Sequence, residues 1–171
     1  MSRSEKLTLV REFPSTIVTA LDALMQSEGY LRVGAESINE DFTPLLAEEG
    51  GPIVFVLSAP QSEWVACFSS LDLDAEWDLV ETLAHAIECP VVYAVFAPER
   101  GVYLYRYWDR GELHEEIVPA DGEAPTLDET ALLEKLATHG IDATLVDDRV
   151  DSFGAEHLVV GYGQRNEEIN A

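Results

Sequence analysis

The 171-residue chain has few cysteines and no long apolar run. Its two cysteines, Cys67 and Cys89, cannot build the framework of several disulfides that small secreted proteins use. The longest apolar runs, at 53–57 and 91–97, are much shorter than the roughly 20 residues that span a bilayer. The opening segment MSRSEKLTLV lacks the apolar core of a signal peptide. We therefore expect a cytoplasmic protein that does not enter a membrane.

Basic residues are scarce as well, because 10 lysines and arginines stand against 33 acids and give a net charge of -23. Such a charge disfavours direct binding to nucleic acid or to anionic lipid. Residues 33–99 contain 13 acids and no lysine or arginine, and residues 109–151 contain 13 acids and three bases, a net charge of −10. A soluble or salt-adapted surface explains this pattern, and the presence of only two lysines is typical of salt adaptation. A face that attracts a basic partner explains it equally.

The common catalytic motifs are also missing. No G-x-S-x-G or G-x-x-x-x-G-K-[ST] sequence occurs, and Gly161-Tyr162-Gly163 is too short for a phosphate loop. Cys67 and His85 could pair, but the surrounding segment has no cation to stabilise a thiolate, which favours a buried structural cysteine. Asp78, Glu81 and His85 share a helical face, yet no other histidine has ligand spacing. The sequence predicts no enzyme, no metal and no cofactor.

Hydrophobic periodicity predicts three amphipathic helices. Apolar residues recur at helical spacing within 14–29, 73–87 and 126–140. The first segment begins at a proline and ends at a glycine, and the second has Asp72 or Asp74 as its N-cap. Thr126 and Glu129 have the spacing of a capping box for the third helix, which Gly140 would end.

Short apolar or alternating runs predict a mostly antiparallel sheet. A hairpin is expected from 52–58 and 63–69, and a three-stranded meander from 91–97, 102–108 and 112–118, with Gly101 and Gly111 in its turns. Further short strands are expected at 6–13, 30–33, 143–146 and 157–160. The polar segment 34–51 reads as a loop with one helical turn at 43–47, and 118–125 as a linker. The sequence thus predicts one α+β domain over 1–163 and a frayed tail over 164–171.

Two surfaces are candidates for binding a partner. The helix at 73–87 must turn its apolar side inward, so the acids on its opposite side should face solvent. The middle strand of the meander carries tyrosines on one face and Leu104, Arg106 and Trp108 on the other, so both faces are covered or one face meets a partner. The simpler interpretation is that one row packs against a helix while the other is half-exposed to solvent. The predicted partner-binding residues are Asp74, Asp78, Glu81 and Glu88 of the helix, and as a second choice Tyr103, Tyr105 and Tyr107 of the strand.

The order of the elements resembles that of class I type III secretion chaperones and of YbjN-like bacterial proteins. The resemblance covers roughly residues 15–139 and includes Trp64 in a strand, the helix at 73–87, and the turn glycines Gly101 and Gly111. The acidic segment 34–51 and the region beyond Gly140 depart from it. It implies a small acidic protein that binds another protein without catalysis and that can form a homodimer. Small acidic immunity proteins are similar at this level.

Three classes of function follow from these patterns. The first is a chaperone-like or immunity-like module that binds a basic protein. The second is a DNA mimic, which would inhibit a nucleic-acid-binding protein by presenting carboxylates where DNA has phosphates. The third is an enzyme with an unfamiliar site and a salt-adapted acidic surface. We expect the first, with neither nucleic acid nor membrane as a direct partner.

Overall fold

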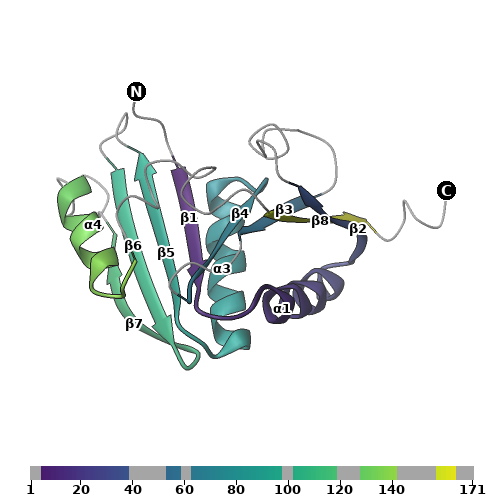
Figure 1. The fold of residues 1–171 in the computed structure, drawn as a ribbon, viewed down its shortest axis with the longest axis horizontal. Coiled ribbons are helices and arrows are strands. Elements are labelled where there is room, and N and C mark those ends of the chain that lie inside the picture. The colour runs from purple at the N-terminus through teal and green to yellow at the C-terminus, as the bar shows by residue number, and fades with distance from the viewer. Residues whose placement is uncertain are drawn as a thin grey trace.

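The computed structural model describes residues 5–38, 53–58, 63–97, 102–118, 128–141 and 157–164. These residues form an α+β fold of eight strands and three helices, which confirms the predicted fold class (Figure 1). In chain order the elements are β1 (Glu5–Val10), α1 (Pro14–Ser27), β2 (Tyr30–Ile38), β3 (Ile53–Ser58), β4 (Val65–Ser69), α3 (Leu73–Ile87), β5 (Val91–Ala97), β6 (Val102–Asp109), β7 (Glu112–Ile117), α4 (Glu129–Ala137) and β8 (His157–Gln164).

All eight strands belong to one sheet of order β2-β8-β3-β4-β1-β5-β6-β7, in which neighbouring strands are antiparallel. The predicted hairpin is β3–β4, and the predicted meander is β5–β6–β7. β1 lies between β4 and β5 and joins the hairpin to the meander. The fold is therefore held together by pairing between strands that are distant in sequence.

The helices cover both faces of the sheet. α1 and α3 lie on one face, where Phe55, Tyr93 and Trp108 are among the fully buried side chains. α4 lies on the other face and packs Leu132 and Leu136 into a second core cluster (Figure 1). The middle strand of the meander, β6, contributes side chains to both clusters. The row of Leu104, Arg106 and Trp108 is buried, whereas in the tyrosine row only Tyr105 is buried and its two neighbours are half-buried.

Two of the three described helices, α3 and α4, begin at an acidic N-cap. The Asp72 carboxylate accepts a 2.8 Å hydrogen bond from the Ala75 backbone N–H, which makes Asp72, not Asp74, the N-cap of α3. The predicted capping box of α4 is wrong in register. Asp128 is the N-cap and accepts a 2.8 Å hydrogen bond from the Ala131 N–H, so Glu129 is the first residue of the helix.

Two strands are longer than the sequence indicates. β2 continues to Ile38, through the first five residues of the segment predicted as a loop, because β8 pairs with it along this length. β8 reaches Gln164, which places the first residue of the predicted tail within the strand and Gly161 and Gly163 in its pairing register. The helical turn predicted at 43–47, the strand at 143–146 and the tail from 165 lie outside the described residues.

Candidate binding site

Of the acidic stripe predicted on the second helix, Asp74, Asp78 and Glu81 lie on the outer side of α3, whereas Glu88 follows the helix as its C-cap in the left-handed conformation. Asp74, Asp78 and Glu88 are exposed, while Val80 and Leu83 are buried against the sheet. Glu81, a fourth predicted residue, is half-buried, because its carboxylate lies 3.4 Å from Nη2 of Arg106 on β6. Folding therefore gives Glu81 a cation that the local sequence does not contain. The exposed charge of the stripe is concentrated at the other three positions.

Arg106 is a buried charge that sequence reasoning did not single out. Its guanidinium carbon lies 4.1 Å from the Trp77 ring centre and 4.6 Å from that of Trp108, so two indoles enclose it. Its Nε donates a 2.7 Å hydrogen bond to Glu116 on β7. This arrangement connects α3, β6 and β7, and it packs the helix against the sheet.

Glu76 is a second buried charge, on the inner side of α3. Its carboxylate lies 3.1 Å from Nζ of Lys6 and accepts a hydrogen bond from the Ser69 hydroxyl. Burial raises its pKa, an effect that outweighs the nearby Lys6 ammonium. Because Lys6 is distant from Glu76 in sequence, periodicity alone could not have found this pair.

The cysteine and histidine considered as a catalytic pair have different surroundings. Cys67 is only 6% exposed, and burial together with the Glu76 carboxylate raises the pKa of its thiol far above the usual range. His85 is exposed, and its Nδ1 is hydrogen-bonded to the Gly111 carbonyl. The environment of Cys67 is that of a structural thiol.

The tyrosines of β6 lie on the face of the sheet that α4 covers. Tyr105 is fully buried, and its hydroxyl hydrogen-bonds Nε2 of His139, which follows α4. The centre of the Tyr107 ring is 4.3 Å from that of His139. Tyr103 and Tyr107 are half-buried. The side chains of β6 alternate between the two faces of the sheet, as the sequence indicates. Tyr105, a predicted partner-binding residue, is an interior residue and not a surface one.

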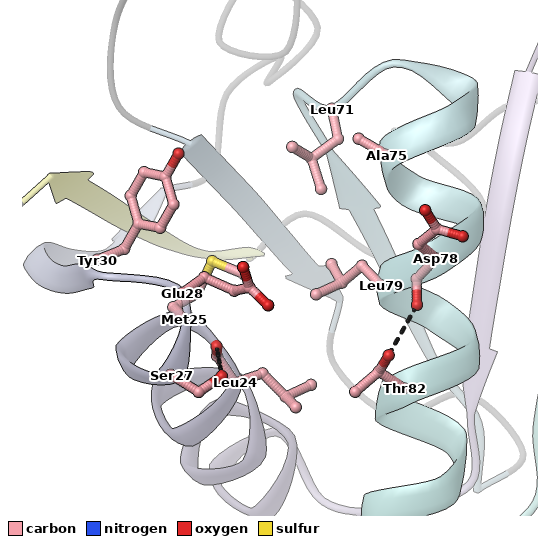
Figure 2. Close-up of a pocket in the computed structure, with 10 residues that line it drawn as sticks. All are labelled: Leu24, Met25, Ser27, Glu28, Tyr30, Leu71, Ala75, Asp78, Leu79 and Thr82. Carbon is pink, nitrogen blue, oxygen red and sulfur yellow. Dashed lines mark hydrogen bonds between the residues drawn. The ribbon is translucent and has the colours of Figure 1, made fainter.

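A groove lies between the C-terminal end of α1 and the outer side of α3 (Figure 2). It has a volume of about 310 Å³. The hydroxyls of Ser27 and Thr82 point back to their own helices, where they donate hydrogen bonds to the carbonyls of Leu24 (2.7 Å) and Asp78 (3.0 Å). The lining residues are Leu24, Met25, Ser27, Glu28, Tyr30, Leu71, Ala75, Asp78, Leu79 and Thr82.

The charged groups of this groove are both acidic. Glu28 comes from the cap of α1 and Asp78 from α3, and both side chains are exposed. Within the described parts of the chain, neither carboxylate forms an ion pair, and no lysine or arginine lines the groove. Sequence reasoning selected Asp78 but missed Glu28 and Tyr30, since only the packing of α1 against α3 brings these segments together.

Two other features of the described residues bear on function. They contain no group of three or more His, Cys, Asp and Glu side chains that could hold a metal ion. No helix among them is long and apolar enough to cross a membrane. In comparisons with known proteins, no family model, curated protein or solved structure matches the chain.

Proposed function

We propose that this chain is a non-catalytic, cytoplasmic binding module that engages a basic segment of a partner protein, in the manner of a chaperone or an immunity protein. The observation that carries the proposal is the α1–α3 groove. It combines an aliphatic floor with the carboxylates of Glu28 and Asp78, which have no counter-cation among the described residues. A partner with positive charge next to an apolar group would complement both parts.

The two parts of the surface contribute differently to binding. The carboxylates of Asp74 and Asp78 attract and orient a basic partner, an effect that mainly raises the association rate and weakens in salt. Affinity depends on burying an apolar or aromatic anchor, and the groove beside these carboxylates provides a place for one. Charge and groove thus act together on the same face of α3.

The polar groups inside the molecule support binding over catalysis. Glu76 and Arg106 are buried, and both are engaged by ion pairs with neighbouring side chains. Cys67 is buried with a raised thiol pKa, which leaves it without the thiolate that a nucleophile needs. These groups have the environments expected of structural residues.

Selection from a library of short random peptides tests the proposal. The immobilised chain should enrich peptides that carry positive charge beside an apolar residue. The double variant Asp74→Asn/Asp78→Asn should retain them several-fold less, since each exposed ion pair contributes about 0.2–1 kcal/mol.

The matched control is Glu36→Gln/Glu134→Gln, which removes the same charge from exposed positions on β2 and α4. This control should retain the peptides as the wild type does. Enrichment of neutral or acidic peptides would contradict the proposal, as would equal losses in the two double variants.

A further inference from the structure

We propose that the α1–α3 groove is a pocket for one arginine or lysine side chain of the partner, that is, for an alkyl chain ending in a cation. The inference rests on the function proposed above and specifies the group that the site recognises. It follows from the size of the groove, from the distribution of its apolar and charged groups, and from the end of α1 that it exposes.

The size of the groove selects a small ligand. Its volume of about 310 Å³ is at the lower end of the roughly 300–1,000 Å³ found for ligand pockets. This is enough for a single long side chain and too little for a whole helix. The partner therefore inserts an anchor into the groove while the rest of its surface stays outside.

The floor and the walls of the groove match the two parts of such a side chain. Leu24, Leu71 and Leu79 supply aliphatic surface on which methylene groups can pack. Glu28 lines the groove from α1 and Asp78 lines it from α3, so the charged groups of the lining favour a cation over a neutral or acidic group (Figure 2). A neutral apolar side chain would bring no charge to these carboxylates, and an acidic one would be repelled by them.

The helix that ends here adds to the preference for a cation. Leu24, Met25, Ser27 and Glu28 belong to the last turn and cap of α1, where backbone carbonyls give a partial negative charge. The last turn of α1 contains no basic residue to balance this charge. A cation bound in the groove would therefore interact favourably with the helix end as well as with the two carboxylates.

The remaining polar groups leave these acceptors available. The Ser27 and Thr82 hydroxyls already donate to carbonyls of their own helices, so they do not donate to the carboxylates. The Tyr30 side chain completes the lining from β2. The site thus presents carboxylate acceptors beside aliphatic surface, which is the complement of an alkyl chain that ends in a cationic donor.

The experiment compares cationic and neutral probes of the same shape at low salt. The methyl signals of Leu24, Leu71 and Leu79 are followed by NMR during titration with N-acetylarginine amide and N-acetyllysine amide. The neutral counterparts are N-acetylcitrulline amide and N-acetylnorleucine amide. The two cationic probes should shift these signals saturably and bind several-fold more tightly than their neutral counterparts.

Variants test the residues that carry the inference. Glu28→Gln/Asp78→Asn should weaken binding of the cationic probes by about two- to fivefold for each carboxylate removed. Glu36→Gln/Glu134→Gln, with the same change in net charge, should leave their affinity unchanged. Equal binding of norleucine amide, equal effects of the two double variants, or the absence of saturable shifts overturns the inference. Tighter binding of 1,5-diaminopentane than of both amino-acid amides also overturns it, by assigning the groove to a free diamine.

The outcome distinguishes this inference from the proposed function. If basic peptides are selected in a way that depends on Asp74 and Asp78 but the amides do not bind, the module stands and the single-side-chain anchor is wrong. If peptide retention does not depend on Asp74 and Asp78, and amide binding does not depend on Glu28 and Asp78, both proposals fail.

Discussion

Arg106 and Glu76 place charges inside the protein, where an unpaired charge would be costly. Each is compensated by a residue from a different element: Arg106 by Glu81 and Glu116, and Glu76 by Lys6. The sequence placed Arg106 on the same face as Trp108, since alternation along a strand is local. It could not identify the Trp77 ring or the Glu81 carboxylate as partners, because these contacts depend on how α3 packs on the sheet.

His139 is the residue whose protonation should report on the packing of α4. Its ring is half-buried, is hydrogen-bonded through Nε2 to the Tyr105 hydroxyl and lies against Tyr107. Burial lowers its pKa from the ordinary value of 6.5, an effect reinforced by Lys135 and opposed by Glu115. The folded protein therefore binds this proton less readily than the unfolded chain does. Its contribution to stability is present above the unfolded pKa and is lost as the pH falls.

We accordingly expect His139→Gln to cost more stability near neutral pH than in mild acid. The free energy of unfolding of the wild type minus that of the variant should shrink between about pH 7.5 and about pH 5. Urea unfolding at each pH measures this difference in the free energy of unfolding. The many acids titrate in both proteins, so their effects cancel in the difference. His114→Gln, which removes an exposed histidine from β7, is the control. A pH-independent difference for His139→Gln would show that the proton on this ring is not linked to folding.

Among the elements, α3 was predicted with its bounds because its signal is local. A continuous apolar stripe and an acidic cap are visible within one segment of the chain. β2 and β8 were predicted too short because pairing between two distant segments sets their lengths. For the same reason, the sequence could identify only the α3 side of the groove and not the α1 side. Asp78 belongs to the conspicuous stripe of α3, whereas Glu28 acquires its place when α1 packs against α3.

The β6–β7 turn offers a direct test of how tightly this meander is joined to α3. Arg110 and Gly111 both have positive φ, 56° and 78°, as the central residues of a two-residue hairpin turn. A β-carbon on Gly111 would lie 3.3 Å from the backbone oxygen of His85 in α3. We expect Gly111→Ala to lower the free energy of unfolding by about 1–2 kcal/mol, since the left-handed region is unfavourable for alanine.

Gly34→Ala is the matched control for this measurement. Gly34 lies on β2 without a positive φ, and a β-carbon there would meet nothing within 4 Å. Urea unfolding should give a change of no more than about 0.5 kcal/mol for this variant. Equal costs at the two glycines would mean that the turn geometry and the approach to His85 do not constrain the fold.

For the whole molecule, the excess of acids makes fold stability and affinity for a basic partner respond to salt in opposite directions. Of the six lysines and arginines in the described ranges, all but Arg110 form ion pairs with carboxylates. With a net charge of -23, most of the remaining acids repel one another. Salt should screen this repulsion and stabilise the fold, whereas it should weaken attraction to a basic partner.

A salt titration with two measurements therefore separates the two explanations of the acidity. Between about 0.05 M and about 0.5 M NaCl, the screening length falls several-fold. The urea midpoint of unfolding should rise, while the affinity for the selected basic peptides should fall. Glu28→Gln/Asp78→Asn should show a shallower fall in affinity, because fewer carboxylates contribute to the attraction. If the midpoint rises but affinity does not change with salt, the acids serve stability in a salty environment, and electrostatic recognition by the α1–α3 face is excluded.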